Sequence, residues 1–248
     1  MYHSIDESGS PISVDEAGFE RHLDWLSSGA VRVVPFAEIL SVPEEEHAVA
    51  ITFDDAFQSF GQFAWPRLKD RGLPATVFVV SERVGGDNCW GGREEPGIPK
   101  LPLHDWQELA ALAEEGAELG CHSRTHPDLS RRSRAEIEEE LLGSRAAIER
   151  ETGVHATSFA YPFGYHGADA RELARQHFTT SCTTELRVLP AHPEAHLLPR
   201  LDAWYYRSPS GAARLSSWDS LGFHAHLGLR RGARRLKTTL GGAAGASR

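Results

Sequence analysis

The chain has 248 residues, of which 40% are hydrophobic and 25% are charged, and its formal net charge is −9. This length can bury a sizeable core, either as one large α/β domain or as two small ones. The negative charge argues against nucleic acid as a partner, because phosphate contacts require a basic surface.

The C-terminal stretch differs in charge from the rest of the chain. Residues 206–248 form a candidate basic extension, and from position 220 onward they contain no acidic residue. The basic residues of this last part are Arg230, Arg231, Arg234, Arg235, Lys237 and Arg248. A solvated tail is the simpler interpretation, and contact with an anionic membrane surface or a lipid phosphate is the alternative.

Cysteine usage and hydropathy bear on the compartment. Cys89, Cys121 and Cys182 form no C-x-x-C pair, and their odd number excludes a full disulfide framework. No signal peptide opens the chain, and no apolar stretch approaches the ~20 residues that span a bilayer. We therefore expect a cytoplasmic protein, with peripheral membrane contact through the basic extension as an option.

The chain begins with a short extended segment followed by a helix. Residues 1–5 have the pattern of a strand end and look clipped, so one hypothesis is that the natural chain begins upstream, which its intact mass would decide. Ser13 and Glu16 are predicted to form a capping box, in which each side chain accepts a hydrogen bond from the other residue's backbone N–H. Phe19 and Leu23 then follow at helical spacing.

Two adjacent carboxylates end the apolar run at residues 48–51. The sequence Thr52-Phe53-Asp54-Asp55 is typical of a buried strand that delivers both acids to the edge of a sheet, where α/β folds keep their chemistry. Successive side chains of a strand point to opposite sides, so one acid could hold a metal ion and the other a proton. A helix N-cap is the alternative interpretation.

The next segment combines regular elements with a long loop. Residues 57–70 are predicted to form a helix that Pro66 kinks or breaks, and residues 75–80 form a second buried strand. Residues 81–102 contain five glycines and three prolines without any periodicity, which indicates a long surface loop. We interpret this loop as a substrate-facing insertion in which Trp90 stacks on a sugar, with ordinary packing of Trp90 as the alternative.

Two histidines four residues apart follow the next predicted strand. His122 and His126 lie in Gly-Cys-His-Ser-Arg-Thr-His-Pro. A helix is predicted before them, which begins at Asp105-Trp106-Gln107-Glu108, a sequence with the chemistry of a helix cap, and ends at Gly116. Two imidazoles and one carboxylate are a minimal site for a divalent metal that leaves coordination positions open. In a chain with 13 histidines such a pair is usually accidental, but its position downstream of the Asp-Asp pair favours a metal site.

The remaining elements continue an alternation of strands and helices. Ser133 and Glu136 are predicted to cap a helix that ends at Gly153. The strands predicted after it are residues 156–161, 178–183 and 197–203, and residues 168–176 are predicted to form a helix. The first of these strands runs into Phe159-Ala160-Tyr161-Pro162-Phe163-Gly164. Alternating units of this kind imply a parallel sheet, and about seven of them would close naturally as a barrel.

These three motifs, in this order, resemble the polysaccharide deacetylase family, the NodB-like enzymes of carbohydrate esterase family 4. The resemblance covers roughly residues 1–205 as one catalytic domain, with residues 206–248 as the basic extension. It implies an α/β fold, a distorted (β/α)7 barrel in a single domain. The predicted site residues would then meet at the C-terminal ends of the strands.

The resemblance also implies roles for individual residues. Asp55, His122 and His126 would bind one divalent ion, with Zn²⁺ expected and Co²⁺, Ni²⁺ or Fe²⁺ as alternatives. Asp54 would be the base that takes the proton of water, and the backbone N–H of Phe163 would stabilise the oxyanion. Tyr161 and Pro162 belong to an aromatic-proline turn that fits the wall of a substrate groove.

The sequence departs from the family pattern at two places. The family's third motif usually carries an arginine that holds the catalytic aspartate, and this chain has Ala160 there. We assign that role to Arg200, with an ordinary surface arginine as the alternative. The family's C-terminal Leu-x-His is also missing, and His224 and His226 match it poorly.

The opening Tyr-His-x-Ile resembles the circularly permuted poly-N-acetylglucosamine deacetylases, in which the histidine that protonates the leaving amine comes first. The first and last strands of a closed barrel are neighbours, so this histidine can enter from either end of the chain. We therefore expect His3 to be the general acid. A buried, hydrogen-bonded histidine in the first strand is the alternative.

The expected function is metal-dependent hydrolysis of an N-acyl group, expected to be acetyl, from a sugar of a glycan or glycan precursor. The substrate would be a polymer, an oligomer or a lipid-linked sugar. Because Ala160 replaces the family's arginine, a catalytically impaired relative that binds carbohydrate remains an alternative function. A non-haem Fe(II) oxygenase shares the two-histidine, one-carboxylate set, but the adjacent base Asp54 disfavours it.

Overall fold

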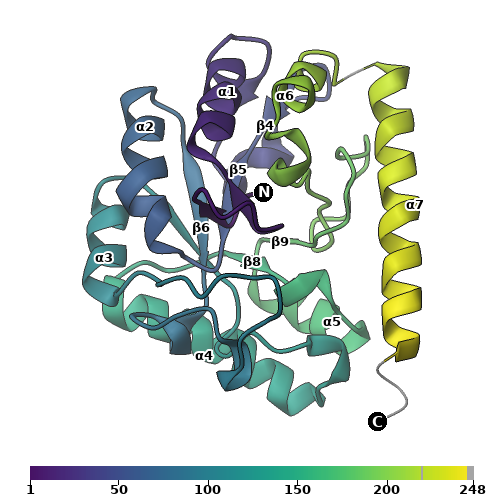
Figure 1. Cartoon of the computed structure of the whole chain (residues 1–248). Helices are drawn as coiled ribbons and strands as arrows, with labels where there is room; N and C mark the ends of the chain where they lie inside the picture. Colours follow the sequence, from purple (N-terminus) through teal and green to yellow (C-terminus); the bar gives the residue numbers. More distant parts are fainter. Residues whose placement is uncertain (219, 245–248) are drawn as a thin grey trace.

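A curled, five-stranded parallel sheet forms the centre of the molecule (Figure 1). The structure is a computed structural model that describes residues 1–218 and 220–244, with side chains in the last helix as far as residue 232. The strands lie in chain order and are β5 (Ile51–Asp54), β6 (Ala75–Val79), β7 (Glu118–Cys121), β8 (Ser158–Ala160) and β9 (Thr180–Cys182). All neighbouring pairs are parallel, as the alternation of strands and helices predicts.

Segments from the two ends of the sequence extend this sheet and meet each other. Tyr2 bridges to Phe53 beside β5, and Leu198 bridges to Cys182 beside β9. The amino group of Met1 donates to the carbonyl of Leu201 at 2.8 Å, and the N–H of Ala203 donates to the carbonyl of Met1 at 3.0 Å. The sheet therefore curls into the distorted (β/α)7 barrel that the sequence predicts.

Helices surround the sheet, and the C-terminal helix lies farthest from it (Figure 1). They are α1 (Glu16–Leu26), α2 (Trp65–Asp70), α3 (Trp106–Glu114), α4 (Arg134–Thr152), α5 (Ala168–His177), α6 (Pro209–Leu215) and α7 (Leu221–Ala244). Two short parallel pairs, β1 (Ser4–Ile5) with β2 (Ser13–Val14) and β3 (Arg32–Val33) with β4 (Ala48–Val49), lie outside the main sheet. None of the helices in the described part of the chain has both the length and the hydropathy needed to cross a bilayer.

The predicted caps of α3 and α4 are confirmed. Asp105 with Glu108 and Ser133 with Glu136 form complete capping boxes, and Gly153 ends α4 in the left-handed conformation. Each box satisfies two backbone N–H groups that would otherwise lack a partner at the start of the helix.

The predicted capping box of α1 is wrong. The carboxylate of Asp15 caps this helix by accepting a hydrogen bond from the N–H of Gly18. Ser13 lies in β2, where it pairs with Ser4, and its hydroxyl donates to Asp6 at 2.8 Å. The pairing of β1 with β2 thus takes Ser13 away from the helix, and the neighbouring aspartate provides an equally good cap.

The core on the outer face of β5 sets the direction of its side chains. Phe53 stacks on Tyr2 with ring centroids 4.9 Å apart and contacts Phe60 at 4.8 Å. Phe60 begins a π-helix, Phe60–Ala64, that continues into α2, where Pro66 occupies the first turn. Because side chains alternate along a strand, burial of Phe53 on the outside turns Thr52 and Asp54 toward the inside of the barrel.

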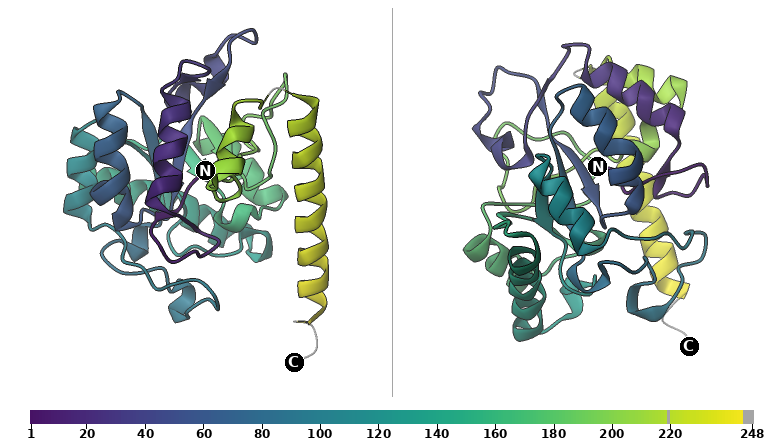
Figure 2. Two further views of the ribbon diagram at one scale, coloured as in Figure 1. Left: turned by 45° about the horizontal axis from the view of Figure 1, so that its top comes forward. Right: turned by 90° about the vertical axis from the view of Figure 1, so that its left-hand side faces the viewer.

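The C-terminal helices attach to the flank of the barrel. Leu186, Tyr206, Leu215, Phe223 and Leu227 form a separate buried cluster that holds the beginning of α7. The left view of Figure 2 shows α7 along this flank, with α6 and the segment after β9 between it and the sheet.

Candidate metal centre and active site

Strained backbone positions the two aspartates at the end of β5. Asp54 is the last residue of the strand, and Asp55 and Ala56 follow it with φ values of 73° and 61°. Such conformations cost residues other than glycine about 1–3 kcal/mol each and are concentrated at functional sites. Both carboxylates are buried.

Asp55, His122 and His126 converge on one point. One ligand atom from each residue lies within 4.8 Å of the others. Nε2 of His122 is 3.5 Å and Nε2 of His126 is 3.4 Å from Oδ1 of Asp55. His122 directly follows β7, and φ values of 66° at Ser123 and 61° at His126 turn the loop back so that the second ring faces the first.

The chemistry of these three side chains fits a divalent cation. Oδ1 of Asp55 is buried and has no hydrogen-bond partner among the described residues. Nδ1 of His122 donates to the carbonyl of Ala160 at 2.7 Å, which leaves the lone pair on Nε2, the nitrogen that faces Asp55. A buried carboxylate oxygen that faces two imidazole nitrogens is costly unless a cation shares them.

Burial shifts the titration of all three residues. It raises the pKa of Asp55 well above its usual range, and the neighbouring Asp54 carboxylate adds to this shift. Burial also lowers the pKa of His122 to about 4 and that of His126 well below its usual range. Both rings are therefore neutral at pH 7, the form in which imidazole binds metals.

Arg200 holds Asp54 from the other side of the barrel. Its Nη1 and Nη2 donate to Oδ1 and Oδ2 of Asp54 at 2.6 and 2.7 Å. Nη1 also donates to the hydroxyl of Thr52 at 3.2 Å, and Nε donates to the carbonyl of Thr183 at 2.9 Å. Burial, the largest single influence, would raise the pKa of Asp54, but the charge and hydrogen bonds of Arg200, together with His122 and His3, hold that pKa well below its usual range. Asp54 is therefore ionised.

His3 lies beside the same carboxylate. The backbone of Tyr2 pairs with β5 on both sides of Phe53, which places His3 next to Asp54. Nε2 of His3 is 4.0 Å from Oδ2 of Asp54, beyond direct hydrogen-bond distance, and the His3 side chain is 22% exposed. Burial lowers the pKa of His3, and the Asp54 carboxylate opposes that shift.

The aromatic-proline turn contributes one exposed ring. Phe163 has a φ of 57° and is 40% exposed, and its ring edge meets His126 with centroids 4.4 Å apart. Tyr161, which the sequence suggested for substrate contact, is fully buried against Phe159, and Pro162 is buried too. The turn therefore offers Phe163 to a substrate and places the other two side chains in the protein interior.

The structure adds contacts that the sequence did not predict. Trp90, predicted to stack on a sugar or to pack in the loop, stacks on the ring of His126, with centroids 4.3 Å apart. Thr52 and Thr183, to which the sequence assigned no role, bind the guanidinium of Arg200. The position of Thr52, two residues before Asp54 on the same strand face, was the available signal for its role.

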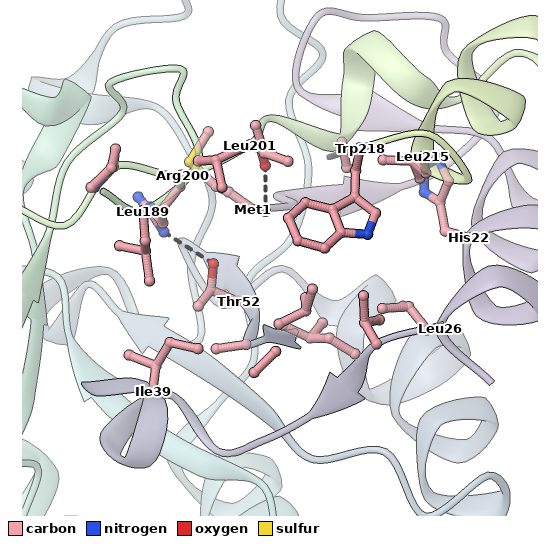
Figure 3. Close-up of a pocket in the computed structure, with 18 of the residues that line it drawn as sticks. Met1, His22, Leu26, Ile39, Thr52, Leu189, Arg200, Leu201, Leu215 and Trp218 are labelled. Atoms are coloured by element: carbon pink, nitrogen blue, oxygen red, sulfur yellow. Dashed lines mark hydrogen bonds between the residues drawn. The ribbon is translucent and has the colours of Figure 1, made fainter. Parts of the chain in front are cut away.

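An apolar cavity of about 180 Å³ lies away from this chemistry (Figure 3). Figure 3 shows Arg200 and Thr52 on one side of it and Trp218, Leu215 and His22 on the other. Its described lining includes Arg200 but neither the aspartate pair nor the two histidines. The cavity therefore lies behind Arg200, and the reaction site is the cluster around Asp55.

A family model described as polysaccharide deacetylase matches residues 41–181, more than half of the chain. The chain belongs to the polysaccharide deacetylase family.

Two named proteins are similar to parts of the chain. YxkH of Bacillus subtilis, assigned to the polysaccharide deacetylases, is 26% identical over 181 residues, which are 71% of this chain and 60% of YxkH. The poly-beta-1,6-N-acetyl-D-glucosamine N-deacetylase of Staphylococcus aureus is 25% identical over 170 residues, 63% of this chain and 56% of that enzyme. The chain thus spans less than two thirds of the length of these relatives.

Two solved structures share the fold. IcaB from Ammonifex degensii superimposes with a TM-score of 0.71 at 23% identity, over 88% of this chain and 94% of IcaB. The Streptococcus pyogenes deacetylase PplD, solved in complex with acetate, superimposes with a TM-score of 0.67 at 19% identity, over 81% of this chain and 89% of PplD.

Proposed function

We propose that this protein is a metal-dependent N-deacetylase that hydrolyses the N-acetyl group of a sugar in a glycan or glycan precursor. The observation that carries the proposal is the convergence of Asp55, His122 and His126 beside an aspartate that Arg200 keeps ionised. A divalent ion bound to the three residues would supply Lewis acidity, which polarises an amide carbonyl and acidifies water. Zn²⁺ is the expected ion, because two imidazoles and a carboxylate suit it, and Co²⁺, Ni²⁺ or Fe²⁺ remain alternatives.

Asp54 is proposed as the general base that takes the proton of the attacking water. A carboxylate has about four lone-pair sites, and Arg200 occupies two of those on Asp54, so its oxygens can still accept a proton. The two-pronged contact fixes the direction of the carboxylate, which general-base catalysis requires.

His3 is proposed as the general acid that protonates the leaving amine. Its Nε2 lies 4.0 Å from Oδ2 of Asp54 and its side chain is 22% exposed, so a sugar nitrogen could approach the ring. We also propose that the backbone N–H of Phe163 donates to the oxyanion, since the positive φ of Phe163 sets the orientation of its peptide next to His126.

The proposed substrate is an N-acetylated sugar in a polymer, an oligomer or a lipid-linked precursor. The exposed ring of Phe163 contacts His126 and lies 6.0 Å from the exposed ring of Tyr165, and both offer apolar faces on which a sugar can stack. The S. aureus relative, named as a poly-beta-1,6-N-acetyl-D-glucosamine N-deacetylase, favours a polymer of N-acetylglucosamine.

The basic extension and the compartment remain proposals. Arg230 lies over the ring of Tyr205 at 4.9 Å, and Arg231 approaches Glu185 at 3.9 Å, so both face the protein itself. The side chains of Arg234, Arg235, Lys237 and Arg248 lie outside the described residues. Membrane contact through this stretch would appear as salt-sensitive binding to vesicles that contain anionic lipid.

The three cysteines are free and buried, which supports a cytoplasmic location.

The experiment that tests the proposed function is acetate release by protein stripped of metal and then reconstituted with Zn²⁺. N-acetylated monosaccharides, oligosaccharides and lipid-linked sugars would be compared, with Asp54→Asn as the matched control. We expect acetate from at least one of these substrates with the wild type and a loss of at least a hundredfold in the variant. Zn²⁺-independent release, or full activity of Asp54→Asn, would contradict the proposal. An iron-dependent reaction that stops without oxygen would instead favour an oxygenase.

A further inference from the structure

The two histidines of the metal centre are held in different ways. His122 donates from Nδ1 to the carbonyl of Ala160 at 2.7 Å, the usual outer hydrogen bond of a metal-binding imidazole. Nδ1 of His126 is equally buried, yet it has no hydrogen-bond partner in the described part of the chain. Something other than a hydrogen bond must therefore set the orientation of the second ring.

Two aromatic rings enclose the imidazole of His126. Trp90 stacks on it, with centroids 4.3 Å apart and an interplanar angle of 28°. Phe163 meets it edge-on, with centroids 4.4 Å apart and an angle of 68°. A stacked ring on one side and an edge on another restrict rotation of the imidazole about its side-chain bonds.

We propose that Trp90 is a positioning residue for His126, whose stacking keeps Nε2 directed at Asp55 in place of the missing hydrogen bond on Nδ1. This inference rests on the proposed metal centre, because the orientation of Nε2 matters only if the nitrogen binds an ion. It gives the long loop between β6 and α3 a function that does not depend on substrate.

The loop is tied down so that Trp90 is in place before any substrate arrives. Oδ1 of Asp87 accepts hydrogen bonds from Arg83 at 2.9 Å and from the N–H of Cys89 at 3.0 Å. Lys100 lies 3.0 Å from Oδ2 of the same carboxylate. These contacts fasten both ends of the segment that carries Trp90.

A second side chain closes the same segment. Asn88 donates to the carbonyl of Pro99 at 3.0 Å and accepts from the N–H of Leu101 at 2.8 Å. Asn88 itself is buried. The two loop segments that flank Trp90 are thus joined directly, which pre-organises the stacking of Trp90 on His126.

The test measures Zn²⁺ affinity of the full chain by competition with a chromophoric chelator. We expect Trp90→Leu, which keeps an apolar side chain but lacks an aromatic plane, to raise the Kd for Zn²⁺ about tenfold, as loss of an outer partner of a metal ligand does elsewhere. Trp90→Phe should keep the Kd within about threefold of wild type. Trp204→Phe, which removes a tryptophan that contacts Arg207 instead, should leave it unchanged.

The visible spectrum of bound Co²⁺ gives a readout independent of turnover. Trp90→Leu should change this spectrum, since the direction of His126 Nε2 changes, whereas Trp90→Phe should resemble wild type. An unchanged Kd and Co²⁺ spectrum in Trp90→Leu would overturn the inference and leave the proposed function standing. A raised KM for sugar with unchanged Kd for Zn²⁺ would also overturn it, in favour of sugar stacking. Failure of the wild type to bind any of Zn²⁺, Co²⁺, Ni²⁺ and Fe²⁺ would remove the proposed function and this inference together.

Discussion

Asp54 and Arg200 are 146 positions apart in the sequence and joined by two short hydrogen bonds inside the barrel. Removing one partner of a buried ion pair leaves an uncompensated charge and costs about 3–5 kcal/mol. We therefore expect Arg200→Met to lower the free energy of unfolding by this amount and to lose most acetate release. Urea unfolding and the release assay measure the two effects.

A double variant separates the charge from the packing. Adding Asp54→Asn to Arg200→Met removes the unpaired carboxylate, so stability should partly recover while activity stays lost. If Arg200→Met unfolds at the same urea concentration as wild type, the contact between Arg200 and Asp54 contributes little to stability and the account of this pair is wrong.

His3→Gln tests the proposed acid. The variant should fold and bind Zn²⁺ like wild type but lose about 10²–10⁴-fold in kcat, the usual contribution of a general acid. A general acid must be protonated, so wild-type kcat should fall as pH rises through the pKa of His3, which burial lowers. The variant should lack this dependence. Near-normal turnover would exclude His3 as the acid.

At this scale the sequence indicates which residue types matter but not all of their contacts. The Asp-Asp and His-x-x-x-His patterns mark Asp55, His122 and His126, which lie together in space because they follow the ends of two parallel strands, and Asp54, which ends the first of these strands. Trp90 could not be assigned between sugar stacking and packing, because its contact with His126 depends on the path of a loop without periodicity.

At the scale of elements, the buried histidine His22 of α1 joins separate parts of the fold. His22 donates from Nε2 to the carbonyl of Tyr206 at 2.8 Å, and its Nδ1 accepts from the hydroxyl of Tyr2 at 2.9 Å. The ring thus links α1 to the first barrel segment and to the turn Ala203–Tyr206. Only the neutral ring can accept at Nδ1, and burial lowers the pKa of His22 to about 4.

This arrangement makes stability depend on pH. Between about pH 4 and 6.5 His22 is protonated in the unfolded chain but neutral in the folded protein. The free energy of unfolding therefore rises with pH over this window, by about 3 kcal/mol for this group. Urea unfolding at a series of pH values should show a shallower rise for His22→Gln than for wild type. Parallel curves for the two proteins would contradict this role of His22.

Element prediction succeeds where local signals agree with the tertiary structure. The helices after Asp105 and Ser133 begin where their capping boxes predict. The box at Ser13 fails because a partner strand competes for that residue, which local spacing cannot reveal. The π-helix Phe60–Ala64, which precedes α2, could not be predicted either, since the spacing of its hydrophobic residues is that of an ordinary α-helix.

For the whole molecule, we propose that residues 206–248 are an extension that the metal centre does not require. Phe223 and Leu227 are buried in the cluster that attaches α7. Replacing both with alanine should loosen α7, because each truncation of a buried side chain costs about 2–5 kcal/mol. Faster cleavage by protease near residues 221–232, with unchanged affinity for Zn²⁺, is the expected result. Loss of Zn²⁺ binding would contradict the proposal.

The barrel and its closure could be predicted from the number of alternating strands and helices, but the particular contacts that close it could not. The bridge from Tyr2 to Phe53 and the bond from Met1 to Leu201 join segments at opposite ends of the sequence. Sequence periodicity carries no information on such distant pairing, so the place of His3 and Arg200 beside Asp54 rested on resemblance to a family.

The most direct test of the metal centre is the anomalous scattering of crystals grown with Zn²⁺, recorded on both sides of the zinc absorption edge. The account predicts one strong peak about 2.0–2.2 Å from a carboxylate oxygen of Asp55 and from Nε2 of His122 and His126. A crystal with no peak there, or with zinc bound by other residues, would contradict it.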